Sequence, residues 1–411
     1  MGPEAFFTRI NFLFFSKWLY LASGDVIIKT ILWMGEENKG VYIKMILNRS
    51  GKKTIASIGM AVFVFTVGIS VLQPIKAEAF NLGAAAGALA GSAVHYAQFN
   101  KELNYYNNDG RNKYFEEIKK KDGVNEDSYK NELLTNIMTR LSTSIAQTDA
   151  SIISKPYNYF VNNQTTFNAY CTLGHNMSVN EGLFDLLNDN ENEVAFVVGH
   201  EMGHGQKDHP IQGFKKTVPV SIIANVWGSQ TSGVASSSVN VLANYATAVN
   251  ITKPQEWEAD NLAFGYAVGA GYNPGAGAAV WQRVIEKMGS SSSNFVGEIF
   301  SPSDHPKNEE RRENYSKKLT EYSNQHVTVA NGAIKVNGKD FMTAGATNSM
   351  SSEERAYLIA GNLAAVYHNN TVAPEAYVEN GFVKMGDQAI LAPNGNETDA
   401  DALADKLNHI R

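Results

Sequence analysis

Apolar residues recur at helical spacing over residues 112–147, and the charged residues there lie opposite the apolar face. The spacing predicts one amphipathic helix, whose apolar face comprises Leu133, Leu134, Ile137, Met138 and Leu141. Residues 157–180 are instead rich in aromatic and β-branched side chains around an Asn162-Asn163 turn, which predicts short strands. The helical pattern returns over Glu181–Leu187 and Glu191–Gly205.

A weak internal repeat follows near the C-terminus. Residues 327–336 and 376–385 each place an Asn-Gly pair between alternating apolar positions, which predicts a two-residue hairpin in each copy. A helical stretch follows each hairpin, first at Ser352–Tyr367 and then at Ala400–Ile410. Residues 326–411 are therefore predicted to form a small α+β module, ββα repeated twice. A binding or targeting role and a packing role both remain open for it.

The front of the chain has the pattern of a signal peptide. An apolar stretch, Ile55–Leu72, is preceded by Arg49, Lys52 and Lys53 and followed by Ala77-Glu78-Ala79. This pattern predicts a signal peptide over residues 45–79, with the mature chain beginning at Phe80. No cysteine stands directly after the apolar stretch, so a lipoprotein anchor is not expected. Residues 1–44 are interpreted as the product of an incorrectly assigned upstream start codon.

A competing interpretation treats Phe12–Met34 and Ile55–Leu72 as membrane spans. Charged residues in the first of these, Lys17, Asp25 and Lys29, are costly at the centre of a bilayer and favour the signal peptide. The predicted location is therefore the periplasm, the cell envelope or the exterior. Residues 80–100 contain a small-residue tract, Gly83–Gly91, that is interpreted as a linker or a weak helix start.

The amino-acid composition excludes several classes of protein and of site. Hydrophobic residues make up 44% and charged residues 18% of 411, which is enough for a packed core and excludes wholesale disorder. Beyond residue 79, 26 Lys and Arg face 36 Asp and Glu, a net charge of −10. The absence of a basic excess argues against nucleic acid as a partner. The single cysteine, Cys171, excludes an internal disulfide and a cysteine-based zinc site.

The strongest chemical signal is His200-Glu201-Met202-Gly203-His204 within the predicted helix Glu191–Gly205. Positions i and i+4 share a helix face, so both imidazoles can converge on one ion. Zinc accepts neutral imidazole nitrogens, and Glu201 beside the metal can take a proton from water. Lys207 and Pro210 stand where the metzincin pattern requires Gly and His, which excludes that class. His209 is predicted to point away from the pair and to lie at the surface.

A catalytic zinc needs a third protein ligand. The segment Gln255–Asp260 offers Glu256 and Asp260 on one helical face, while Glu258 is predicted to face roughly the other side. One carboxylate of the pair can bind the metal while the other orients a ligand histidine.

The three-part arrangement of His200–His204, Glu256 with Asp260, and His305-Pro306 followed by Arg311 resembles the M48 (Ste24/HtpX-like) zinc metallopeptidases. Three shorter segments agree with that family's edge strand and following helix: Asn168–Tyr170, Val179–Leu183 and Asp185–Leu187. The resemblance covers about residues 100–320. It implies a mostly helical, gluzincin-type α+β domain with a small edge-stranded sheet, here over residues 101–322.

The resemblance also implies roles for individual residues. Glu256 becomes the third ligand of one Zn²⁺ per chain, Glu201 the general base, and Asp260 a partner of the ligand shell. His305 becomes a mobile active-site histidine, which either caps the zinc at rest or stabilises the tetrahedral intermediate. Arg311 would hold that loop or the nearby acidic residues.

HtpX-like members carry membrane spans on both sides of the motif, whereas Val218–Val249 is too polar for a span. The soluble, exported branch of the family therefore fits better, and any membrane association would not use spans of the mature chain. The implied activity is a zinc metalloendopeptidase that hydrolyses misfolded or envelope proteins, bound in extended form along Thr165–Thr172. A non-hydrolytic zinc-containing chaperone or adaptor and an integral membrane protease remain alternatives.

Overall fold

The computed structural model describes four short strands near the N-terminus and most of the chain from residue 82 onward. The described ranges are 22–23, 26–27, 29–34, 41–46, 82–227, 234–248, 250–288, 306–370 and 372–411. The early strands form two antiparallel pairs, β1 (Ala22–Ser23) with β2 (Val26–Ile27) and β3 (Lys29–Met34) with β4 (Val41–Ile46). Contacts divide the chain into residues 1–82 and residues 83–411. The apolar stretch of the predicted signal peptide, Ile55–Leu72, lies outside the described residues.

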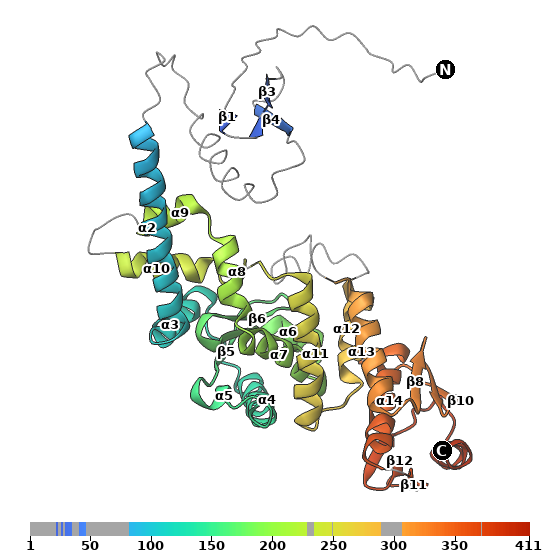
Figure 1. Cartoon of the computed structure of the whole chain (residues 1–411). Coiled ribbons are helices and arrows are strands. Elements are labelled where there is room, and N and C mark those ends of the chain that lie inside the picture. Colours follow the sequence, from blue (N-terminus) through green and yellow to red (C-terminus); the bar gives the residue numbers. More distant parts are fainter. Residues whose placement is uncertain are drawn as a thin grey trace, which may run out of the picture. The chain divides into compact units, whose positions relative to one another are not determined.

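The second unit begins with three helices, α2 (Leu82–Asn107), α3 (Arg111–Asp122) and α4 (Ser128–Ala146) (Figure 1). The small-residue tract lies in the first turns of α2, so the helix-start interpretation is confirmed and the linker interpretation is wrong. Alanine, the main residue of the tract, is the best helix former. The single helix predicted over residues 112–147 is also wrong. Gly123, with φ +76°, ends α3, and the Asp127 side chain accepts hydrogen bonds from the backbone at the start of α4.

A three-stranded sheet with strand order β5-β7-β6 lies at the centre of this unit. Its strands are β5 (Asn158–Asn162), β6 (Ala169–Thr172) and β7 (Asn176–Asn180). β5 is parallel and β6 antiparallel to β7, so β6 lies at one edge. The predicted short strands are confirmed, but the expected edge segment Thr165–Thr172 is a strand only from Ala169 onward.

The helices after the sheet include the one that carries the paired histidines. They are α6 (Glu181–Leu186), α7 (Glu191–Gln206), α8 (His209–Thr217), α9 (Val220–Trp227), α10 (Val234–Asn244), α11 (Lys253–Gly269) and α12 (Ala276–Met288). Across the described residues, no helix combines the length and the hydrophobicity needed to cross a bilayer.

Helices α7 and α11 pack side by side through small residues (Figure 1). A Cβ atom added at Gly203 of α7 would lie 3.2 Å from the Cα atom of Ala259 on α11. One turn earlier on α7, Gly199 faces Ala263 in the same way. The absence of side chains on the two glycines therefore lets the backbones approach closely.

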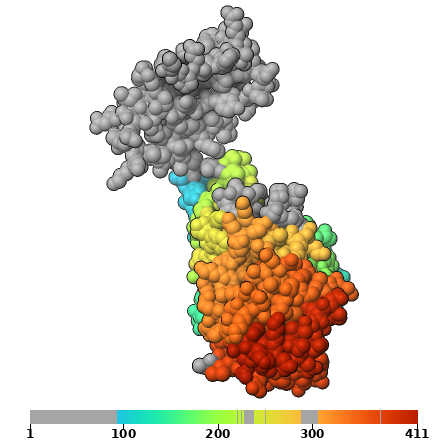
Figure 2. Space-filling view, turned by 90° about the vertical axis from the view of Figure 1, so that its right-hand side faces the viewer, coloured from blue at the N-terminus to red at the C-terminus, as the bar shows by residue number. Residues whose placement is uncertain are grey.

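The C-terminal elements are α13 (Asn308–Tyr322), β8 (Val327–Ala330), β9 (Ala333–Val336), β10 (Lys339–Thr343), α14 (Ser352–Asn369), β11 (Ala376–Glu379), β12 (Phe382–Met385), β13 (Gln388–Leu391) and α15 (Ala400–Ile410). Two of the C-terminal helices, α13 and α14, pack against α12, and the remaining C-terminal elements pack on these two helices and on one another. The residues after 306, orange to red in Figure 2, form a continuous surface on the face shown. The predicted mostly helical α+β fold is confirmed.

Both predicted hairpins are present. Asn331-Gly332 and Asn380-Gly381 have positive φ angles, as type I′ turns require. Each hairpin gains a third antiparallel strand that the ββα prediction lacks, β10 in the first copy and β13 in the second. In the first copy this strand follows a further Asn-Gly turn, Asn337-Gly338, which also has positive φ angles.

A cluster of three buried charged residues connects α7, α12 and the C-terminal region. Arg283 on α12 donates to Glu193 of α7 (Nε to Oε2, 3.2 Å) and to Glu354 of α14. The same guanidinium donates to the backbone oxygens of Leu186 and Ser349. Because both carboxylates depend on one guanidinium, the cluster fixes α14 against the helix that carries the paired histidines.

Candidate metal centre

Helix α7 positions the paired histidines. The Asn190 side chain caps its first turn by accepting from the backbone N–H groups of Asn192 and Glu193. Its apolar residues, among them Val194 and Val198, lie in the main hydrophobic core. His200 and His204 then follow one turn apart, and both are buried.

Helix α11 brings a carboxylate to the same point. Thr252 and Gln255 form a capping box at its start, and Glu256 lies in its first turn. The Glu256 oxygens lie 3.4 Å from His200 Nε2 and 3.5 Å from His204 Nε2, and the two Nε2 atoms are 3.0 Å apart. In the described ranges, these three are the one group of His, Cys, Asp or Glu residues whose ligand atoms converge. Two imidazoles and a carboxylate form a donor set that suits zinc.

Asp260, one turn after Glu256, supports His200. Its Oδ1 atom lies 2.9 Å from His200 Nδ1. Arg311 Nη2 lies 3.1 Å from the same nitrogen, but the carboxylate is closer and is the acceptor of the two. Burial raises the pKa of Asp260, but the positive charge of the Arg311 guanidinium lowers it more. The pKa therefore lies below its ordinary value, and the carboxylate stays charged. A charged acceptor on Nδ1 directs the free Nε2 lone pair of His200 toward the metal position.

Two side chains hold Asp260 in turn, and a third packs on one of them. Arg311 pairs with both of its oxygens, at 2.8 Å from Nε to Oδ2 and through Nη2 to Oδ1. The Tyr315 hydroxyl donates to Oδ1 at 3.0 Å, and the ring of Trp281 stacks on the Arg311 guanidinium at 3.8 Å. Arg311 and Tyr315 both lie on α13, so a third helix contributes to the site beside α7 and α11.

Glu201 faces the edge strand of the sheet. The backbone N–H of Cys171 in β6 donates to its Oε2 atom at 2.9 Å. Burial raises the pKa of the Glu201 carboxyl to about 7. A carboxyl that titrates near neutral pH is suited to accept and return a proton during a reaction.

A mainly apolar pocket adjoins His200 and Glu201. Aromatic and aliphatic side chains line most of it: Phe167, Phe196, Val197, Val280, Trp281 and Tyr315. An extended chain lying against β6 could place one apolar side chain there. The predicted candidate His305 lies outside the described residues, which resume at Pro306.

The prediction for His209 is wrong, whereas the prediction for Glu258 is confirmed. His209 is only 2% exposed, and its Nδ1 atom lies 2.9 Å from Nδ1 of His204. Its Nε2 atom lies 3.3 Å from the Glu258 carboxylate, which is half-exposed and lies off the buried face that carries Glu256 and Asp260. Helical spacing fails for His209 because α7 ends at Gln206 and Asp208 turns the chain with φ +52°. Pro210 was the signal for this break, since proline favours the first turn of a new helix.

Comparisons with known proteins agree with this geometry. The peptidase family M48 matches residues 129–318. Metalloprotease LoiP of Escherichia coli (strain K12) is 27% identical over 185 residues, which are 44% of this chain and 70% of LoiP. Metalloprotease YcaL of the same strain is 33% identical over 118 residues, 28% of this chain and 45% of YcaL.

The beta-barrel assembly-enhancing protease of Escherichia coli (strain K12) is 22% identical over 169 residues, 39% of this chain and 34% of that protein. The chain thus spans most of LoiP but less than half of the other two relatives. The matched region contains the converging donors and the residues around them, from His200 to Arg311. We conclude that residues 129–318 form a domain of peptidase family M48 and that this domain carries a metallopeptidase site.

Proposed function

We propose that the chain is a zinc-dependent metalloendopeptidase of the cell envelope, with Glu201 as its general base. The convergence of His200, His204 and Glu256 carries the proposal, because the three residues are buried and their ligand atoms all lie within 4.8 Å of one another. The two imidazoles and the Glu256 carboxylate would hold the ion and leave a fourth position open. Bound there, Zn²⁺ would supply Lewis acidity that lowers the pKa of water and polarises a peptide carbonyl.

The side chains around the donors supply the remaining chemistry. Glu201 would take the proton of the attacking water and return it to the leaving amide nitrogen. The Cys171 amide would orient the Glu201 carboxylate for both steps. The substrate backbone would add to the free edge of β6, with an apolar side chain in the adjoining pocket. The family resemblance adds His305 as a candidate active-site histidine.

The first test measures whether the protein loses zinc when a proposed ligand is replaced. The purified full chain should contain one zinc ion, and 1,10-phenanthroline should stop its digestion of casein until Zn²⁺ is restored. His204→Ala should hold far less than one equivalent after dialysis, as measured by plasma mass spectrometry. His409→Ala, at an exposed histidine of α15, is the control and should keep full zinc. A full equivalent in His204→Ala would contradict the ligand assignment.

The envelope location is supported by the signal-peptide pattern and by the name of one relative, a beta-barrel assembly-enhancing protease. Misfolded or envelope proteins are the substrates that such a location favours. The protein recovered from the exported fraction of a bacterial host should begin at Phe80, as read by N-terminal sequencing. An intact N-terminus in the membrane fraction would instead support an integral membrane protease.

A further inference from the structure

We propose that His209 and Glu258 form a hydrogen-bonded relay that positions the imidazole of His204 for metal binding. The inference rests on the metal ligation proposed above and adds two positioning residues to it. It concerns the side of His204 that faces away from the metal position.

The two ring nitrogens of His204 face different groups. Its Nε2 atom faces the other donors, at 3.0 Å from His200 Nε2 and 3.5 Å from Glu256 Oε1. Its Nδ1 atom faces His209 Nδ1 at 2.9 Å, within hydrogen-bond distance. Both histidines are buried, so water has little access to this contact.

Only one arrangement of protons satisfies all these contacts. Because Nε2 of His204 must be unprotonated to bind a metal, Nδ1 carries the proton and donates it. His209 must then accept at Nδ1 and carry its own proton on Nε2. That Nε2 atom lies 3.3 Å from Glu258 Oε2, a carboxylate oxygen that accepts the hydrogen bond. Each group therefore donates to the next, from His204 through His209 to Glu258.

Contacts of the neighbouring residues hold this relay in place. Asp208, in the left-handed turn before His209, accepts from the Asn107 side chain at 3.3 Å and lies 3.8 Å from the Lys155 ammonium. Helix α11 supplies Glu258 two residues after Glu256, so one helix carries both the proposed third ligand and the end of the relay.

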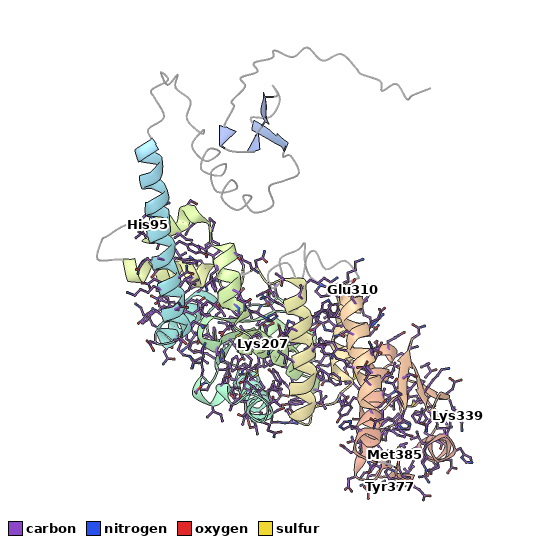
Figure 3. The ribbon with its side chains drawn as sticks, in the orientation of Figure 1. His95, Lys207, Glu310, Lys339, Tyr377 and Met385 are labelled. Carbon is purple, nitrogen blue, oxygen red and sulfur yellow. The ribbon has the colours of Figure 1, made fainter. Side chains whose placement is uncertain are left out.

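The two ligand histidines thus have different supports. His200 donates directly to Asp260, a fully buried carboxylate that Arg311 neutralises. The His204 relay ends at Glu258, whose side chain is 47% exposed and lies 3.7 Å from the Lys207 ammonium. Figure 3 labels Lys207 among the central helices. A partner on the second nitrogen fixes the ring and raises its basicity, and losing such a partner typically weakens metal binding about 10- to 100-fold.

The test replaces the middle of the relay in the full chain. His209→Leu keeps an apolar side chain of similar bulk but offers His204 no acceptor. Its zinc dissociation constant, from chelator competition, should rise about 10- to 100-fold. The visible absorption bands of the Co²⁺-substituted protein should shift, because the His204 ring is no longer held. His209→Gln, which can both accept and donate, should restore both measurements toward the wild type.

Phe214→Leu is the matched control. Phe214 is fully buried on the same helix, α8, but belongs to an apolar cluster away from the donors. It should bind zinc like the wild type, and circular dichroism should show all three variants folded. Wild-type affinity and spectrum in His209→Leu, or an equal loss in Phe214→Leu, would overturn the relay. Failure of the wild type itself to bind zinc would instead overturn the proposed function.

Discussion

Replacing Glu201 with glutamine is expected to abolish most peptide hydrolysis while leaving the zinc in place. The amide is nearly the same shape and can still accept from the Cys171 N–H, so the helix and its neighbours should not move. It cannot take a proton from water, however, and a general base typically contributes about a hundredfold to ten-thousandfold in rate. The turnover number for a quenched fluorescent peptide should therefore fall by about that factor.

Zinc content separates this result from simple loss of the site. Glu201→Gln should keep one equivalent, unlike His204→Ala. Glu313→Gln is the control for the chemical change, because that side chain is 72% exposed and belongs to neither the donor group nor the lining of the adjoining pocket. It should digest the peptide at the normal rate. Hydrolysis by Glu201→Gln at the wild-type rate would show that another group removes the proton.

Replacing Arg283 with methionine is expected to lower the free energy of unfolding by about 3–5 kcal/mol. The methionine preserves most of the volume but leaves Glu193 and Glu354 buried without their shared cation. Breaking a buried ion pair by removing one partner is costly because the remaining charge is uncompensated. Urea denaturation, followed by circular dichroism at pH 8, measures the loss.

The dependence on pH gives this prediction a second test. Burial and the neighbouring Glu354 raise the pKa of Glu193, and burial raises the pKa of Glu354. A carboxyl with a raised pKa binds more protons in the folded state, so its contribution to stability falls as the pH rises above the unfolded value. Arg283 lowers both values. Without it, the penalty should be smaller at pH 5, where the carboxyls can be neutral, than at pH 8.

Lys317→Met is the control for losing a cation. Lys317 is 77% exposed and pairs with Glu321 at 3.7 Å, so its removal should cost less than about 1 kcal/mol. The triple change of Arg283→Met with Glu193→Gln and Glu354→Gln should recover part of the stability, because it removes the buried charges together. Equal stability of Arg283→Met and the wild type would refute the role assigned to the cluster.

Helical spacing explains why much of the site could be predicted from sequence. His200 with His204 and Glu256 with Asp260 each lie four residues apart, and each pair shares a face once its segment is helical. The spacing of residues within one helix does not predict whether two helices pack against each other. The family resemblance supplied the link between the pairs, and the packing of Gly203 on Ala259 provides its physical basis.

Predictions failed where the chain leaves regular structure, and sequence reasoning missed the buried charges. His209 lies beyond the end of α7, so its direction depends on a left-handed turn at Asp208 rather than on helical spacing. Gly123 interrupts a helix pattern that looks continuous in its apolar residues. The cluster around Arg283 joins residues about 70 and 90 positions away in the chain, and such charged residues are ordinarily expected in solvent.

The close crossing of α7 and α11 also determines the size of the opening between the donor atoms. Glu256 lies on α11, whereas His200 and His204 lie on α7. The distances between the Glu256 oxygens and the imidazoles therefore depend on how closely these two helices pack. A methyl group at position 203 would meet the main chain of α11 at 3.2 Å and force it outward. The spacing of the three donor atoms therefore depends on the small residues at 203 and 259 as well as on the donor side chains themselves.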